Sequence, residues 1–413
     1  MKPTVLGNLS LATFLTDYWQ KKPLLIRNAL PTDISPITAD ELAGLACEDR
    51  VESRLIIQNG EQWDLQIGPF NEQTFAQLPP SHCTLLVQAV DHYIPAAAEL
   101  LEKFNFIPRW RIDDLMMSYA NDGGGVGPHY DNYDVFLIQV SGQRQWEVGG
   151  NYLDRATQPA AHNAFVANLP VKILSEFTPE NAWTLNPGDI LYVPPGVGHN
   201  GVAQGDDCMT CSVGFRAPSH SEILREYTDY VGEQLNESLR YTDPELQAQS
   251  NTGQISSHAL KSIQQILTHY ANDEAMIKNW FGKHVTTPKY QAASDLQLNV
   301  EDTEHEEYGL DELEHHLLSG GIIQKNESSR FAYIAGEDNE VIPGGNKVIP
   351  SGKANHILFV DGDQIPTQAN NNSLVELLAQ LPMLDKSHIE KTASNMSLLL
   401  NLLNHGALYL AEQ

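Results

Sequence analysis

Three residues able to bind a metal stand in two short segments of the chain. His129 and Asp131 are separated by one residue, and His199 follows 70 residues after His129. Two imidazoles and one carboxylate form the facial triad that holds non-haem Fe(II), with open positions on the metal for a cosubstrate and O2. Residues two apart on a β-strand share a face. We therefore expect His129 and Asp131 to lie on one strand and His199 on a neighbouring strand.

Glycine and proline surround both segments. Gly123 precedes the first segment, and Pro194 and Gly196 precede His199. A lone His-x-Asp is more often exposed polar surface than a metal site, but the second segment makes that explanation much weaker. The spacing resembles the two motifs of a cupin barrel, with Asp131 where many cupins have a second histidine. The pattern favours a metal site.

Arg144 is the candidate anchor for an acidic cosubstrate. It follows a strand expected at 134–140 and a turn expected at 141–142. A guanidinium binds a carboxylate through two parallel hydrogen bonds, and many Fe(II) oxygenases take electrons from 2-oxoglutarate, whose far carboxylate needs a fixed cation. Taken alone, Arg144 would more simply be a surface arginine. On neighbouring strands, the hydroxyls of Ser118 and of either Thr210 or Ser212 could complete the carboxylate site. Trp146 shares the strand face of Arg144 and is expected to form a wall of the pocket.

Length and composition favour a cytoplasmic protein of two or three domains. The chain has 413 residues, of which 41% are hydrophobic, and it has no run of 18 apolar residues that would span a membrane. The first residues lack the pattern of a secretion signal. Four cysteines do not make a disulfide framework. Cys208 and Cys211 have the spacing of a redox or zinc pair, but residues three apart on a strand face opposite sides, so we expect free thiols.

The net charge of −28 restricts the partners of the protein. An acidic surface repels the phosphates of nucleic acids and anionic lipids, so we expect neither DNA nor a membrane as partner. It attracts basic partners. From charge alone, a cationic protein substrate and simple solubility or salt adaptation remain equally open.

Three regions follow one another along the chain. Residues 1–217 contain many short strands, at 22–27, 53–57, 83–87, 134–140 and 208–215, which is typical of a jelly-roll or cupin barrel. Helices at 11–19 and 39–45 would cover the barrel. Residues 218–289 contain two amphipathic helices, the first opened by a capping box of Ser219 and Glu222. These helices could pack on the barrel or form a subunit interface.

The acidic region 290–413 mixes helices and strands. We expect a helix at 309–318, strands at 330–335 and 356–360, a helix capped by Ser373 and Glu376, and a final helix reaching Leu410. This order suggests a winged-helix unit, but DNA binding would need a basic face. Glu304–Glu307 with His315 and His316 could bind a metal, although a solvated helix face is the better interpretation.

Four stretches identify a family resemblance: 110–119, 123–136, 188–196 and 212–218. They resemble the bacterial JmjC ribosomal oxygenases, and within these the family that hydroxylates an arginine of large-subunit ribosomal protein L-sixteen. The segment 14–24 also fits, and the motifs weaken beyond about 290. The resemblance implies an α+β chain: a double-stranded β-helix (jelly-roll/cupin, JmjC) barrel, a helical dimerisation segment that makes a homodimer, and a C-terminal winged-helix domain.

The resemblance also implies roles for single residues. His129, Asp131 and His199 would bind Fe(II), Arg144 would hold 2-oxoglutarate, and Thr210 replaces an asparagine of the family. The reaction would use O2 to hydroxylate C3 of an arginine, and 2-oxoglutarate would become succinate and CO2. A basic ribosomal protein as substrate agrees with the acidic charge. From residue chemistry alone, the candidates for orienting a substrate guanidinium are Tyr133, Asp134 and Asp114.

Three other functions are compatible with parts of this pattern. Hydroxylation of a ribosomal histidine would use an identical metal site. Lysine demethylation is less favoured, because four cysteines cannot build the zinc clusters of chromatin readers. A cupin-like scaffold without activity, whose acidic C-terminal region recruits partners, is opposed by the complete triad and Arg144. Coupled consumption of 2-oxoglutarate would separate an enzyme from a scaffold.

Overall fold

The chain forms two compact units. The computed structural model describes residues 4–152, 165–290, 307–336, 339–341, 348–350 and 354–412. The units separate between Ala217 and Pro218, and Tyr290 and Asn326–Ser328 group with the first unit. The helices after Pro218 group with most of the C-terminal region in the second unit. The division of the chain into three domains therefore remains a prediction.

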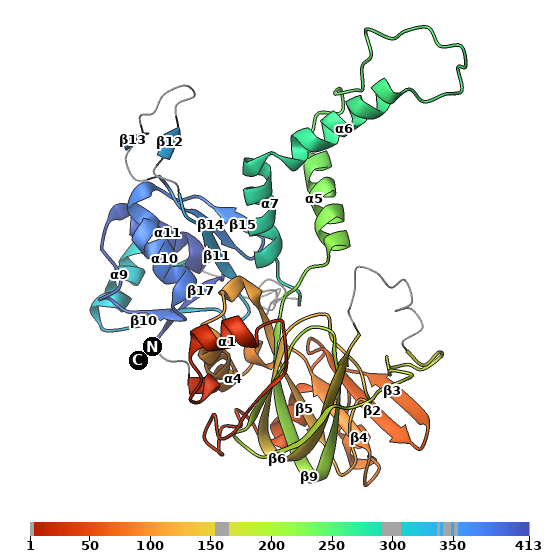
Figure 1. Ribbon diagram of the computed structural model, residues 1–413. Helices are drawn as coiled ribbons and strands as arrows, with labels where there is room; N and C mark the ends of the chain where they lie inside the picture. Colours follow the sequence, from red (N-terminus) through yellow and green to blue (C-terminus); the bar gives the residue numbers. More distant parts are fainter. Residues whose placement is uncertain are drawn as a thin grey trace. The chain divides into compact units, whose positions relative to one another are not determined.

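One antiparallel sheet of nine strands is the body of the first unit. Its strands are β1 (Leu24–Ile26), β2 (Ser53–Asn59), β3 (Gln62–Ile67), β4 (Cys83–Val87), β5 (Ile112–Ala120), β6 (Val135–Asn151), β7 (Asn181–Leu185), β8 (Ile190–Val193) and β9 (Val197–Phe215). Their order is β1-β8-β6-β9-β5-β4-β2-β3, with β7 paired to β6. Figure 1 shows the strands wrapped around a common interior, which confirms the predicted barrel.

Strand β6 sends alternate side chains to two different cores, because successive residues of a strand point to opposite faces. Val135 and Leu137 pack in one core, which also contains residues of β7 and β8. Phe136 and Ile138 pack in the larger core, which includes residues of the N-terminal helices. We call the face of β6 and β9 that carries Val135, Leu137 and His199 the inner face.

Short helices cover the larger core. Phe14, Leu42 and Leu100 are buried there, and they come from three different helices. The helical elements of this unit are η1 (Thr4–Leu6), α1 (Leu11–Asp17), α2 (Ala39–Leu45), α3 (Glu72–Ala76), η2 (Val90–His92), α4 (Pro95–Leu101), η3 (Glu102–Phe104) and η4 (Arg109–Arg111).

The predicted bounds of α2 and β4 are confirmed, but the turn predicted at 141–142 is wrong. The register of β6 against β9 shifts near Ser141, yet the strand continues to Asn151. It continues because β9 on one side and β7 on the other supply hydrogen-bond partners. Arg144 therefore lies within β6 and not after a turn.

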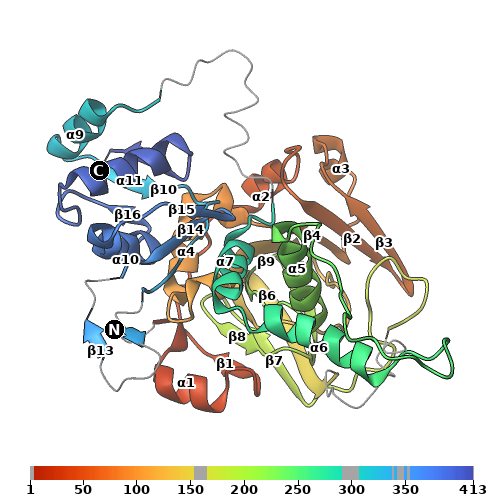
Figure 2. The same ribbon diagram turned by 90° about the horizontal axis from the view of Figure 1, so that it is seen from above.

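The second unit begins with three helices, α5 (His220–Gln234), α6 (Ser257–Ala271) and α7 (Glu274–Thr286). The predicted capping box of Ser219 and Glu222 is present at the start of α5. Only two helices are predicted from the sequence in this region, and α7 is the additional one. The Tyr227 ring of α5 contacts Trp280 of α7 edge to face, with centroids 5.4 Å apart. Figure 2 shows α5 beside α7.

The C-terminal part of this unit contains two three-stranded sheets, β16-β10-β17 and β11-β14-β15. Its elements are α9 (Leu310–Leu318), β10 (Ile322–Lys325), β11 (Phe331–Ile334), β12 (Asn339–Val341), β13 (Val348–Pro350), β14 (Ile357–Val360), β15 (Asp363–Ile365), η6 (Ala369–Asn371), α10 (Asn372–Gln380), β16 (Met383–Leu384), α11 (Ala393–Asn404) and β17 (Leu408–Ala411). Across the described ranges, no helix is long and apolar enough to cross a membrane.

Two details predicted for this region are wrong. Ser373 does not cap α10, which begins after Asn371 without a side-chain cap. The final helix ends at Asn404, because Leu408–Ala411 pairs with β10 as a strand. The winged-helix assignment remains a prediction.

Candidate metal centre and cosubstrate pocket

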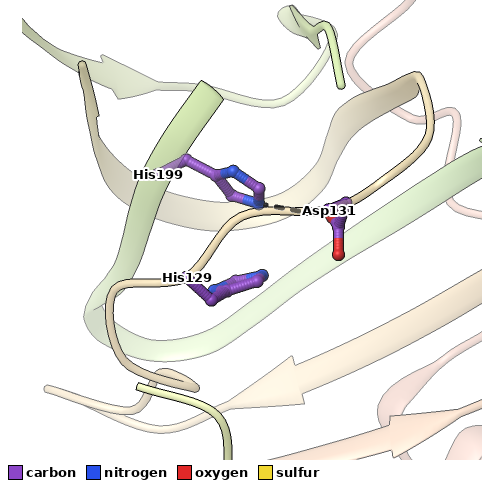
Figure 3. A group of neighbouring side chains, drawn as sticks. All are labelled: His129, Asp131 and His199. Atoms are coloured by element: carbon purple, nitrogen blue, oxygen red, sulfur yellow. Dashed lines mark ion pairs between the residues drawn. The ribbon is translucent and has the colours of Figure 1, made fainter. Parts of the chain in front are cut away.

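The structure brings the three predicted metal ligands together. One ligand atom from each of His129, Asp131 and His199 lies within 4.8 Å of the others, and Figure 3 shows the three side chains gathered around one point. His199 stands on β9, as predicted for a neighbouring strand. His129 and Asp131 lie in the segment between β5 and β6, where His129 makes an isolated β-bridge. The expectation of a regular strand there is wrong.

Backbone hydrogen bonds join the two segments that carry the ligands. The His129 N–H donates to the His199 carbonyl at 3.0 Å, and the His199 N–H donates back at 2.8 Å. The Gly196 N–H donates to the Asp131 carbonyl at 2.7 Å. Gly196 has a φ of +77°, which favours glycine over residues with a β-carbon. The Gly-x2-His spacing therefore fixes both ends of the segment from His129 to Asp131.

Both histidine rings present the same nitrogen to the centre. Nδ1 of His129 lies 2.9 Å from the Gly127 carbonyl, and Nδ1 of His199 lies 3.1 Å from the Val197 carbonyl. A carbonyl oxygen only accepts, so each Nδ1 carries the proton and each Nε2 keeps a free lone pair. Burial, followed by the neighbouring His129, lowers the pKa of His199 to about 4. His199 is therefore neutral and able to bind a metal near pH 7.

The donor set matches a divalent transition metal. Two imidazole nitrogens and one carboxylate oxygen converge, and Nε2 of His199 lies 3.6 Å from Oδ2 of Asp131. This combination is typical of non-haem Fe(II) sites. In the part of the chain that the structure describes, it is the one group of three or more potential ligands. The alternative cluster, Glu304–Glu307 with His315 and His316, falls partly outside the described residues.

Arg144 is a buried cation and not a surface arginine. It lies on the inner face of β6, only 3% exposed, opposite Ala203 of β9. Its Nε and Nη2 atoms are buried and have no hydrogen-bond partner. These two atoms form one edge of the guanidinium, and such an edge binds a carboxylate through two parallel hydrogen bonds. The pocket therefore fits an acidic cosubstrate.

Ser118 and Thr210 lie opposite each other on β5 and β9. Both are buried, and so is Ser212. The Ser118 hydroxyl donates to the Thr210 carbonyl at 3.4 Å, and the Thr210 hydroxyl donates to Gln139 at 3.1 Å. Gln139 is fully buried on β6 and is not among the residues predicted from the sequence. The feature of the sequence that could have revealed Gln139 is its position as the one polar residue in the apolar run 135–140.

Of the three residues predicted to orient a substrate, Tyr133 is exposed, at 42%. Its hydroxyl makes a hydrogen bond with Asp131, the metal ligand. The surrounding protein shields part of the side chain from water, and this, followed by the negative charge of Asp131, raises the pKa of Tyr133 even though the residue is partly exposed. Tyr133 is therefore a neutral donor that stands between the metal centre and solvent.

The other two predicted substrate residues are buried and have protein partners. Asp134 accepts hydrogen bonds from Tyr192 at 2.6 Å and from Gln20 at 3.0 Å. Asp114 accepts a hydrogen bond from the Tyr290 hydroxyl at 2.8 Å. These partners favour supporting roles for both carboxylates. The network around Asp134 joins residues far apart in sequence, which no local pattern reveals.

The Cys-x-x-Cys pair has no redox or metal geometry. Cys208 and Cys211 are both free and buried. Cys211 packs in the larger core, whereas Cys208 packs with Ala120 and Ala203. The two thiols therefore face opposite sides of β9, as predicted.

Known proteins resemble this chain over most of its length. Residues 99–223 match the JmjC domain family, and residues 178–275 match the AraC-like ligand binding domain. The chain is 36% identical to the ribosomal protein uL16 3-hydroxylase of Escherichia coli (strain K12), covering 68% of this chain and 73% of that protein. It is 34% identical to a probable ribosomal oxygenase of Haemophilus influenzae, covering 67% and 69%. The E. coli ribosomal oxygenase YcfD, solved with cobalt and 2-oxoglutarate, superposes with a TM-score of 0.80 at 29% identity, covering 98% of each chain.

Proposed function

Since the chain belongs to the family of bacterial JmjC ribosomal oxygenases, we propose that it hydroxylates C3 of an arginine in large-subunit ribosomal protein uL16. The observation that carries this proposal is the buried guanidinium edge of Arg144 on the same inner face of the barrel as His199, which belongs to a complete His-Asp-His triad. A cupin that serves only as a scaffold needs neither feature. The relative that is 36% identical is named a uL16 3-hydroxylase, which supports the substrate.

His129, Asp131 and His199 would hold Fe(II) through two Nε2 atoms and one carboxylate oxygen. Bound Fe(II) and 2-oxoglutarate supply the activation of O2: one oxygen atom enters the substrate C–H bond, the other enters succinate, and CO2 leaves. The Nδ1–H bonds to Gly127 and Val197 fix the ring orientations, a type of support on which metal affinity strongly depends.

Arg144 would bind the far carboxylate of 2-oxoglutarate with its Nε and Nη2 atoms. Its burial excludes water, which strengthens the ion pair relative to one at the surface. Ser118 and Thr210 stand on neighbouring strands and would complete this end of the pocket. The Thr210 hydroxyl donates to Gln139, so Gln139 orients it.

The substrate guanidinium would approach past Tyr133. Asp113 and Asp114 contribute negative charge near its hydroxyl, although Asp113 also pairs with Arg216 at 3.1 Å. A guanidinium can also stack on a tyrosine ring. Asp134 and Asp114 would affect the substrate mainly by positioning their hydrogen-bond partners, Tyr192 and Tyr290.

The test is mass spectrometry of uL16 peptides incubated with the protein, Fe(II) and 2-oxoglutarate. We expect one added oxygen on an arginine, and no addition with the His129→Ala protein. One oxygen on a histidine would replace the arginine proposal with the histidyl alternative. If no peptide is modified and 2-oxoglutarate is not decarboxylated, the result favours the scaffold alternative.

We also propose that the protein is a cytoplasmic homodimer joined through α6. This helix contributes no buried residue, and Leu260, Ile263 and Leu267 are 46–62% exposed along one face. An exposed apolar stripe of this kind marks an interface. A second copy presents the same stripe, and a twofold contact needs only one self-complementary patch. Ribosomal proteins are made in the cytoplasm, where the proposed substrate would be met.

A further inference from the structure

Three buried donor atoms in the barrel have no acceptor. Two belong to Arg144, and the third is the indole Nε1 of Trp146, a residue that is only 5% exposed. Throughout the described residues, these are the only buried side-chain nitrogens or oxygens without a hydrogen-bond partner. Their occurrence on two residues of the same strand suggests one shared ligand.

The register of the sheet places Trp146 between the cation and the metal centre. Trp146 and Arg144 are two residues apart on β6, and they pair with Gly201 and Ala203 on β9. All of them lie on the inner face, as does His199. The centroid of the Trp146 ring lies 5.8 Å from that of His199, and the Arg144 Cζ lies 5.8 Å from the Trp146 ring. A ligand that reaches from Arg144 to the metal must pass this indole.

Packing alone does not explain a tryptophan here. Trp146 belongs to an apolar cluster with Val148 and Leu185, so filling space is one of its roles. Phenylalanine would fill apolar space without burying a polar atom. A buried N–H without an acceptor carries the full cost of losing water, and buried indoles usually find a partner. A ligand that supplies an acceptor removes this cost.

We propose that Trp146 is a further cosubstrate-binding residue, whose indole N–H donates a hydrogen bond to the far carboxylate of the cosubstrate. This inference rests on the proposed function. A carboxylate has two oxygens with about four acceptor positions. The edge of Arg144 uses two of them, so the carboxylate keeps capacity for a third donor. Trp146 thereby favours 2-oxo diacids over 2-oxo acids that have no far carboxylate.

The test measures binding in the absence of turnover. Trp146→Phe keeps an aromatic ring and removes the donor. Trp183→Phe is the matched control. Trp183 lies on β7 and is the direct cross-strand partner of Trp146 on β6, and the indole nitrogen of Trp183 is not among the buried atoms without a hydrogen-bond partner. Calorimetry on the Mn(II)-loaded protein gives the dissociation constants of 2-oxoglutarate and of pyruvate. We expect Trp146→Phe to weaken 2-oxoglutarate about 10-fold, or ~1.4 kcal/mol, and to leave pyruvate unchanged, while Trp183→Phe changes neither.

The Arg144→Met protein separates failure of this inference from failure of the proposed function. If Trp146→Phe binds 2-oxoglutarate normally while Arg144→Met binds it weakly, the role of Trp146 is refuted and the cosubstrate site stands. If neither variant is weakened, the cosubstrate site itself is refuted. An equal loss for pyruvate in Trp146→Phe would place the hydrogen bond elsewhere and overturn the assignment.

A second measurement needs no variant. The chain has six tryptophans, so nitrogen–proton NMR resolves up to six indole signals. The Trp146 signal is the one that Co(II) in the site perturbs most, because its ring contacts that of His199. In the Zn(II)-loaded protein, we expect 2-oxoglutarate to move the Trp146 signal to lower field and pyruvate to leave it in place. If the chemical shift of the Trp146 indole signal does not change when 2-oxoglutarate is added, the proposal is overturned.

Discussion

The six-membered ring of Trp146 lies over Gly201, its direct partner on β9. A β-carbon at position 201 would come within 2.6–2.8 Å of three carbons of this ring. The absent side chain of Gly201 therefore makes the space that a large indole needs inside the barrel. The neighbouring inner-face residue of β9 is His199, so the packing of Trp146 and the metal centre depend on the same strand.

Gly201→Ala should destabilise the protein by about 1–3 kcal/mol, because the added methyl group overpacks a filled core. The indole must shift, so 2-oxoglutarate should also bind more weakly. Urea unfolding measures the first effect and calorimetry the second. Gly44→Ala in α2 is the control: a β-carbon there meets nothing within 4 Å, and the helix should gain up to about 1 kcal/mol. Equal stabilities of the two variants would contradict this packing.

His129→Ala and Asp131→Ala should each abolish turnover and weaken metal binding by at least about 100-fold, since loss of a ligand exceeds the effect of losing a supporting residue. The fold should survive, because the hydrogen bonds that join these segments use backbone atoms. Co(II) titration and thermal unfolding of the metal-free proteins measure the two effects. Wild-type metal affinity in either variant would remove that residue from the site.

Arg144→Met should weaken 2-oxoglutarate by roughly 10- to 100-fold, since a hydrogen bond to a charged group contributes about 1.5–3 kcal/mol. Without ligand, the variant should be as stable as the wild type or more stable, because an unpaired buried charge is removed. Calorimetry and urea unfolding give the two values. A variant that is strongly destabilised without ligand would show that Arg144 has a structural partner.

Tyr192→Phe should destabilise the protein by about 1.5–3 kcal/mol at pH 7. The lost hydroxyl donates to Asp134, which is fully buried. Burial raises the pKa of Asp134, and the bond from Tyr192 opposes that rise. The hydroxyl thus stabilises the ionised carboxylate, so the effect of the substitution should shrink as pH falls toward 4 and Asp134 becomes protonated.

Urea unfolding of the Tyr192→Phe protein at pH 7 and pH 4 tests this pH dependence. Tyr93→Phe is the control, because the Tyr93 hydroxyl donates to a backbone carbonyl and not to a carboxylate. Its smaller effect should be the same at both pH values. A Tyr192→Phe effect that is independent of pH would mean that Asp134 is not ionised at pH 7.

Leu260→Asp with Leu267→Asp should convert the proposed dimer to a monomer, because two charges would enter an apolar interface. Analytical ultracentrifugation measures the change. Gln265→Asp, on the opposite side of α6 by helical spacing, should leave the dimer intact. A wild-type protein that sediments as a monomer would refute the proposed interface.

Local spacing was enough to predict that His129, Asp131 and His199 come together. The His-x-Asp and Gly-x2-His motifs each span only a few residues. Their spacing sets the positions of the backbone groups that hydrogen-bond the two segments to each other. Alternation predicted that Arg144 and Trp146 share one strand face, and they do so on β6 even though the predicted turn at 141–142 is absent. Other local predictions failed, because Ser373 does not cap α10 and His129 makes only an isolated β-bridge.

Features that depend on distant partners were not predictable. The leucines from Leu398 to Leu410 suit one long helix, but Leu408–Ala411 becomes a strand because β10, more than 80 residues earlier, offers hydrogen bonds. Asp134 looked like a substrate contact, and its partner Tyr192 lies 58 residues away. Gln139 stands in an apolar run, and its amide is used by Thr210 across the sheet.

The mutual hydrogen bonds of His129 and His199 also bear on biosynthesis. The chain between them includes β6, β7 and β8, so the two ligands meet only after these strands have been made and β9 has paired. Contacts between residues this far apart in sequence form at a cost in chain entropy, and proteins rich in such contacts tend to fold slowly. A nascent chain that ends before His199 lacks one ligand and cannot complete the triad. Iron binding by all three ligands would therefore require a chain that extends through β9, which ends at Phe215, and a shorter nascent chain would hold the metal with two ligands at most.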